Sequence, residues 1–386
     1  MSINVAGPAS KKIIDLYEHR TARARELHSH GRKVIGYLCC YVPLELFTAA
    51  GVVPYRIMGS LDQTISEADS YLETIVCPFI RSCFDIALKG EYDFLDGIVM
   101  PHSCDTVQRI YDIWKYHKQP AFSHFLNLPH MEDESSKRFY LKELERLKKA
   151  LEDFTGHPIS EADLKSAVSL HNENRGLLRE LYSLRRAEPA LISGTDVTRL
   201  LVVGNTLPVV EYTELIRELI QELRNSGHAA WGGIRFLVYG SEIDDIALIK
   251  LIEDCGAQVV MDDMCTGTRV FWNDVVPKDG LLESLVDRYL CDIVCPRTYR
   301  RRTGSREEDL DRRFGYLKSF IEEFNVKGVI LYIIRFCDTH EFDAPDVMDY
   351  LKKLGIPFLH IEDDYSVTTI GQLKTRVQAF LEVIKD

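Results

Sequence analysis

The sequence predicts an α/β protein with two Rossmann-like parallel-sheet domains joined by a helical segment. Near both ends of the chain, short apolar runs typical of buried strands are followed closely by helical patterns. A long charged-apolar stretch with helical periodicity separates these two regions. The expected domains are an N-terminal α/β domain at 1–133, a helical connector at 134–230 and a C-terminal α/β domain at 231–386.

The first domain is expected to alternate strands with helices. Strands are predicted at 33–38, 52–58 and 95–101, and helices at 44–50, 79–88 and 106–117. Gly51 stands where a helix C-cap glycine belongs, and Pro78 follows Cys77 at a favourable first helical position. Such closely spaced units are typical of a parallel sheet.

The same alternation returns after the connector, whose residues 134–222 carry almost no strand signal. Strands are predicted at 234–240, 257–263, 328–336 and 356–362, and helices at 243–254, 313–325, 345–354 and 369–384. The chain has neither a GxxxxGK[ST] nor a GxGxxG motif. It therefore offers no recognisable cradle for ATP or a dinucleotide.

Composition and charge exclude several classes of partner. Of 386 residues, 46% are hydrophobic and 27% charged, which is typical of a folded globular protein. A net charge of −12 disfavours nucleic acids and anionic membranes as partners. No run approaches the ~20 apolar residues of a membrane span, and the first twenty residues lack the apolar stretch of a secretion signal. We expect a cytoplasmic protein.

The chain has ten cysteines but no CxxC pair, so any metal ligands must converge through the fold. A single free cysteine is more often a small buried hydrophobic residue than a ligand. Cys83, Cys255 and Cys291 fit that interpretation. Six others have geometric reasons to be ligands, because they follow the carboxyl ends of predicted strands or precede a proline: Cys39, Cys77, Cys104, Cys265, Cys295 and Cys337.

We expect at least three of these six thiolates to bind metal. All-thiolate ligation without histidines at ligand spacing favours an iron–sulfur cluster over zinc. His102 and Asp105 flank Cys104 and are weak candidates for acid–base or supporting roles, although Asp105 is more simply a cap for a helix starting at Thr106.

Basic residues near these cysteines leave alternatives open. Arg81 either balances the charge of a cluster or is a solvated side chain. The basic run at 297–302 (RTYRRR) is expected to be a solvated loop, with an anionic cofactor or a partner protein as the alternatives.

Several ordered segments resemble one known family over nearly the whole chain. They include KVIGYLCCYVPLELFTAAGVVPYRIMG (33–59), CPFIRSCFDIALKGEYDFLDGIVMPHSCDTVQRIYDIWK (77–115), LHNENRGLLRELYSLRRAEP (170–189), DDMCTGTR (262–269), IRFCDTHEFDAP (334–345) and IEDDYSVTTIGQLKTRVQAFLE (361–382). The family is that of benzoyl-CoA reductase and 2-hydroxyacyl-CoA dehydratase. The resemblance implies an iron–sulfur cluster held between two α/β domains.

The resemblance also implies which cysteines are ligands. In the reductase-like branch three cysteines, corresponding to Cys77, Cys104 and Cys337, hold a [4Fe-4S] cluster, whereas the dehydratase-like branch uses a cysteine corresponding to Cys39. This chain has both sets and also Cys265 and Cys295. In this larger number of cysteines the chain resembles the double-cubane branch of the family, whose [8Fe-9S] cluster needs three cysteines per cubane. Either Cys39 or Cys40 could be the ligand, and the position relative to Pro43 favours Cys39.

The function implied is that of a reductase that takes low-potential electrons from a separate ATP-hydrolysing iron–sulfur activator. Such a protein would reduce a small substrate and work as a homodimer in an oxygen-poor cytoplasm. One alternative is a single-[4Fe-4S] subunit of a heteromeric 2-hydroxyacyl-CoA dehydratase or benzoyl-CoA reductase. Another is a non-catalytic scaffold paired with an active subunit.

Overall fold

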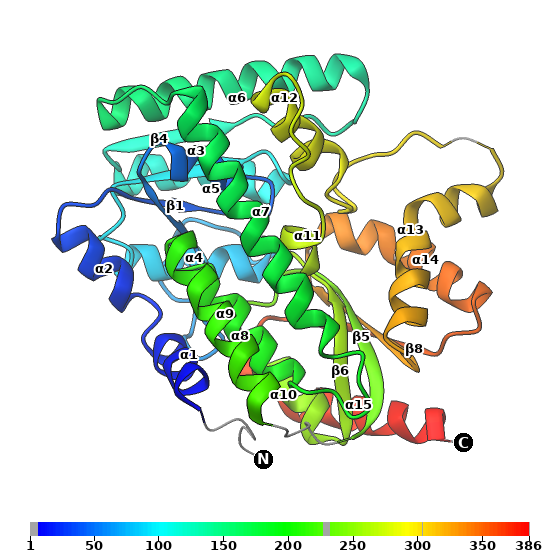
Figure 1. The fold of residues 1–386 in the computed structure, drawn as a ribbon. Coiled ribbons are helices and arrows are strands. Elements are labelled where there is room, and N and C mark those ends of the chain that lie inside the picture. The colour runs from blue at the N-terminus through cyan, green and yellow to red at the C-terminus, as the bar shows by residue number, and fades with distance from the viewer. Residues whose placement is uncertain (1–6, 227–231, 303, 386) are drawn as a thin grey trace.

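The computed structural model describes residues 7–226, 232–302 and 304–385 and contains two four-stranded parallel sheets (Figure 1). The predicted α/β class with two Rossmann-like domains is confirmed. In each sheet the first and third strands in sequence lie side by side at the centre, and the second and fourth strands form the edges. The expected boundary at residue 230 lies outside the described residues.

The first sheet consists of short strands that are largely buried. They are β1 (Val34–Tyr37), β2 (Val53–Arg56), β3 (Gly97–Pro101) and β4 (Phe122–Leu126). The connections carry α3 (Leu44–Ala49), the 3-10 turn Ala68–Ser70, α4 (Pro78–Leu88) and α5 (Asp105–Lys118). As predicted, Pro78 begins α4, and Gly51 follows the end of α3 with a φ of 71°.

The second sheet repeats the strand order of the first. Its strands are β5 (Ile234–Gly240), β6 (Ala257–Asp263), β7 (Gly328–Ile334) and β8 (Phe358–Asp363). Its helices are α10 (Ala247–Asp254), α11 (Thr268–Phe271), α12 (Leu281–Val286), α13 (Arg306–Glu323), α14 (Asp338–Lys353) and α15 (Ile370–Lys385), with a π-helical turn at Asp287–Cys291 and a 3-10 turn at Val367–Thr369.

Long helices connect the two halves, as the periodicity of residues 134–222 predicts. They are α6 (Glu134–Thr155), α7 (Glu161–Ser183), α8 (Gly194–Gly204) and α9 (Val209–Ser226). The helix α7 packs against α3 of the first half and α11 of the second, so it ties the two together (Figure 1). The N-terminal helices are α1 (Pro8–Glu18), which packs on α8 and α9, and α2 (Ala22–Ser29). None of the described helices is long and apolar enough to cross a membrane.

Three elements differ from the prediction for identifiable reasons. The edge strand β4 was not predicted, because only Phe122 and Leu126 at its two ends are fully buried. The helix α13 begins well before residue 313, because the side chains of Ser305 and Glu308 form a capping box at its start. The helix α14 begins at Asp338 and runs through Pro345, which the prediction placed at its first turn.

Candidate functional site

All six cysteines singled out by the sequence line one cavity of about 90 Å³ at the carboxyl ends of the two sheets. They are Cys39, Cys77, Cys104, Cys265, Cys295 and Cys337. The shared strand order explains this convergence. In each sheet the chain leaves the two central strands toward opposite edges, and such a switch point opens a crevice where ligands bind in α/β proteins.

Three of the cysteines stand at the start of substantial helices. Cys77, Cys104 and Cys337 are the N-cap residues of α4, α5 and α14. The first backbone amides of a helix lack intrahelical partners and carry a partial positive charge. Three helix N-termini therefore surround this part of the cavity and favour negative charge there.

The other three cysteines lie in loops and are approached by arginine side chains. Nη1 of Arg269 lies 3.5 Å from Sγ of Cys265. The pKa of Cys39 is lowered to about 6, chiefly by its hydrogen bond with Cys40 and in addition by the charge of Arg56. Cys39 has a φ of 65°, a left-handed conformation that side chains rarely adopt, and such strain concentrates at functional sites.

By position the six thiols form two sets, three at helix N-termini and three in loops, and they are coupled electrostatically both within and between these sets. After burial, the Cys337 and Cys104 thiolates both raise the pKa of Cys77. The pKa of Cys295 is raised to about 12, chiefly by burial and in addition by the Cys265 and Cys39 thiolates, against the opposing charge of Arg269. We call Cys77, Cys104 and Cys337 the helix-cap set, and Cys39, Cys265 and Cys295 the loop set.

The donor set fits an iron–sulfur cluster better than a single metal ion. All ten cysteines are free thiols. In the part of the chain that the structure describes, no three Cys, His, Asp or Glu side chains come close enough together to bind one ion. A zinc ion needs its thiolates about 2.3 Å away on one centre, whereas in a cluster each thiolate binds its own iron. Two sets of three thiols around one cavity match the second requirement.

Burial makes two of the cavity thiols, Cys104 and Cys337, poor nucleophiles. It raises the pKa of Cys104 to about 12 and that of Cys337 to about 11. A thiol of this kind ionises when a bound metal replaces its proton. Cys104 and Cys337 are therefore better suited to metal ligation than to catalysis as free thiolates.

The remaining cysteines lie away from the cavity wall. Cys40 is 5% exposed and is not part of the wall, although its neighbour Cys39 is. Cys83 lies inside α4 in the hydrophobic core, and Cys255 caps the end of α10, as their interpretation as structural residues predicts.

The weak candidates beside Cys104 lie outside the cavity wall as well. Nδ1 of His102 lies 3.4 Å from Oδ1 of Asn127 in an exposed contact. The interpretation of Asp105 as a helix cap is wrong, because α5 begins at Asp105 and Cys104 is its N-cap. The carboxylate of Asp105 is 67% exposed and pairs with Arg109.

The basic residues also differ from expectation. Arg81 pairs with Asp69 and lies outside the cavity wall. The expectation of a solvated loop is wrong for Arg297, which is 4% exposed and lines the thiol cavity. Its guanidinium donates to the carbonyl oxygens of His102 and Leu128, which fixes it beside the thiols.

The sequence-based prediction missed several charged side chains that support the cavity. Arg56, at the end of β2, makes a bidentate ion pair with Glu242 of the second half at 3.1 and 2.8 Å, and Glu242 lines the cavity. Arg269 and His340 contact the thiols themselves. The spacing was a usable signal for His340, which comes three residues after Cys337, the N-cap of α14, and so lies one helical turn on.

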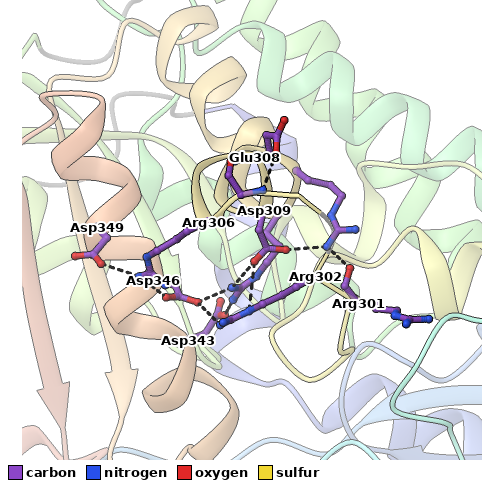
Figure 2. A network of polar contacts seen from close by, with 11 residues as sticks. Arg301, Arg302, Arg306, Glu308, Asp309, Asp343, Asp346 and Asp349 are labelled. Atoms are coloured by element: carbon purple, nitrogen blue, oxygen red, sulfur yellow. Dashed lines mark hydrogen bonds and ion pairs between the residues drawn. The ribbon is translucent and has the colours of Figure 1, made fainter.

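A larger, charged cavity of about 210 Å³ adjoins the thiol cavity, and Cys295 and Thr339 belong to both walls. Its outer wall is an ion-pair network between α13, α14 and the loop before α13 (Figure 2). In this network Arg302 and Arg306 point toward Asp346, at 3.8 and 2.8 Å. Cys295 therefore borders both cavities.

Two parallel sheets whose carboxyl ends share a six-thiol cavity define an α/β protein with two Rossmann-like domains. The family model for 2-hydroxyglutaryl-CoA dehydratase, D-component, matches residues 39–384. The chain belongs to this family, as the resemblance of its motifs predicts.

Three curated relatives match almost end to end. The chain is 30% identical to the candidate dehydratase subunit YjiM of Escherichia coli (strain K12), over 93% of both chains. It is 26% identical to one of the subunits of benzoyl-CoA reductase from Thauera aromatica, over 92% of this chain and 91% of the relative. It is 27% identical to the beta subunit of (R)-2-hydroxyglutaryl-CoA dehydratase of Acidaminococcus fermentans, over 92% and 93%. The relatives are thus dehydratase and reductase subunits.

Proposed function

We propose that the chain is an iron–sulfur reductase whose six cavity cysteines hold a double-cubane [8Fe-9S] cluster. It would take low-potential electrons one at a time from a separate ATP-hydrolysing iron–sulfur activator and pass them to a small substrate. The observation that carries the proposal is that all six cysteines line the same cavity. An all-thiolate cluster supplies one-electron chemistry at low potential when bound.

The division of the thiols supports two cubanes, with one set of three for each. The helix-cap set would hold one through Cys77, Cys104 and Cys337. The loop set would hold the other through Cys39, Cys265 and Cys295. Cys40 is left out because it does not belong to the cavity wall.

The surrounding residues suit an anionic cofactor in a water-poor site. The helix N-termini at the helix-cap set and Arg269 beside Cys265 offset negative charge. Phe79, Ile80 and Ile334 line the same cavity and restrict solvent. Both effects tune the potential of iron–sulfur centres.

A second candidate is a single-[4Fe-4S] subunit of a 2-hydroxyacyl-CoA dehydratase or a benzoyl-CoA reductase. It is favoured by the names of the relatives, which are subunits of such enzymes. The helix-cap set alone would suffice for this function. We propose that the double-cubane protein is a homodimer in an oxygen-poor cytoplasm, whereas the second candidate would need a different partner subunit.

Iron and sulfide analysis of the anaerobically purified chain distinguishes the candidates. We expect about eight irons and nine sulfides per chain, and reduction of the bound cluster that requires both the activator and ATP. About four irons would favour the single-cubane subunit, and a chain without iron would contradict both. Reduction of a substrate in a single turnover would exclude a non-catalytic scaffold.

A further inference from the structure

One buried guanidinium contacts the loop set of cavity thiols directly and the helix-cap set through a histidine. Arg269 is 5% exposed, and two of its nitrogens are committed to Asp263: Nε donates to Oδ1 at 2.7 Å and Nη2 to the backbone carbonyl at 3.0 Å. The third nitrogen, Nη1, has two hydrogens and is directed at two residues of the cavity wall. It lies 3.5 Å from Sγ of Cys265 and 2.8 Å from Nε2 of His340.

The contact with Arg269 determines the tautomer of His340. An arginine nitrogen can only donate, so Nε2 of His340 accepts and the ring proton resides on Nδ1. Nδ1 lies 3.3 Å from Sγ of Cys337 and 3.4 Å from Oγ1 of Thr339. Because Nε2 carries no proton the ring is neutral, and the backbone carbonyl of Gly240 is a further acceptor for the ring N–H. His340 is therefore a neutral N–H donor toward Cys337.

Arg269 thus reaches Cys265 of the loop set directly and Cys337 of the helix-cap set through His340. We propose that Arg269 and His340 are positioning residues that hold these two thiolates in fixed relative positions and raise the reduction potential of the cluster. This inference rests on the proposed function. Hydrogen bonds to ligand sulfurs and a nearby positive charge stabilise the reduced, more negative state over the oxidised one.

The neighbours of this pair keep it rigid. The hydroxyl of Tyr316 donates to the second carboxylate oxygen of Asp263. The ring of Tyr239 lies under the guanidinium, 5.4 Å from Cζ of Arg269 to the ring centroid. Tyr239 and Tyr316 also line the charged cavity, whereas His340 lines the thiol cavity. A donor held in this way loses little free energy to reorganisation when charge arrives.

Two amide variants separate the hydrogen bond to Cys337 from the contact with Arg269. In His340→Gln the amide stands where Nε2 was, so Arg269 keeps an acceptor and Cys337 loses its donor. In His340→Asn the amide nitrogen stands where Nδ1 was, so Cys337 keeps a donor. Val347→Ala, in the core on the same helix, is the control for a loss of packing alone.

The readouts are the iron content and the midpoint potential from an EPR-monitored titration of each anaerobically purified protein. We expect full iron content throughout, a reduction equilibrium at least tenfold less favourable in His340→Gln, equivalent to about 59 mV for one electron, and nearly wild-type potentials in His340→Asn and Val347→Ala. Equal potentials in His340→Gln and His340→Asn, at wild-type iron content, would overturn the inference alone. Absence of iron from the wild-type chain would instead overturn the proposed function.

Discussion

Replacing Cys104 by serine is expected to reduce the iron content of the anaerobically purified chain to about half or less of the wild-type value. Cys104 is the N-cap of α5 and belongs to the helix-cap set. A neutral serine hydroxyl at that position is a much weaker iron ligand than a thiolate. The measurement is iron and sulfide per chain, with the cluster's EPR spectrum as a second readout.

The matched control is Cys83→Ser. Cys83 is also a buried cysteine of the first half, 1% exposed inside α4, but it lies outside the cavity wall. This variant is expected to lose some stability and to keep its iron. Full iron content in Cys104→Ser, or equal iron loss in both variants, would contradict the assignment of Cys104 as a ligand.

Arg175→Met is expected to lower the free energy of unfolding by about 3–5 kcal/mol at neutral pH. Arg175 on α7 pairs with Glu45 on α3, and both side chains are buried, so the pair joins the connector to the first half. Removing the arginine leaves a buried carboxylate without its ion-pair partner, although the hydroxyl of Tyr289 still donates to it at 2.8 Å. An uncompensated buried charge is far more costly than a broken surface ion pair.

The loss of unfolding free energy in Arg175→Met should become smaller as the pH falls. Burial raises the pKa of Glu45, but the charges of Arg175 and His171 outweigh it and hold the pKa at about 2, below the ordinary 4.5. Stability from this lowered pKa is present above pH 4.5 and is lost as the pH falls toward 2. Without Arg175 the Glu45 carboxyl protonates at a higher pH. As the pH falls, the variant therefore loses its unpaired buried charge before the wild type loses its ion pair.

Denaturant unfolding of the wild type and Arg175→Met at neutral pH, and in steps below pH 4.5, measures the difference. The double variant Arg175→Met/Glu45→Gln is the control, because it removes the stranded charge and should recover much of the loss. A deficit that is the same at every pH would contradict the ionic origin of the effect.

The sequence predicts most of the fold, because buried parallel strands are continuous apolar runs. The prediction for β5 (Ile234–Gly240) and β6 (Ala257–Asp263) matches the structure residue for residue. It fails at β4, whose middle residues are half-exposed at a sheet edge. It also places the start of α13 too late, because the Ser305–Glu308 capping box is a stronger start signal than the apolar residues that follow.

The convergence of six cysteines on one cavity could be predicted because strand ends share an edge whatever the details of packing. The supporting charges could not, because their partners are distant in sequence. Arg56 meets Glu242 only where the two halves face each other. Arg297 stands in a run of basic residues that is typical of a solvated loop, and only the fold shows that its guanidinium is buried against backbone carbonyls.

An iron anomalous-scattering map from crystals grown without oxygen would locate the metal within the protein. We expect two adjoining groups of iron peaks in the thiol cavity, one within bonding distance of the helix-cap set and one of the loop set. A single group beside Cys77, Cys104 and Cys337 would contradict the double cubane. A cavity without iron, in protein never exposed to air, would contradict the proposed cluster altogether.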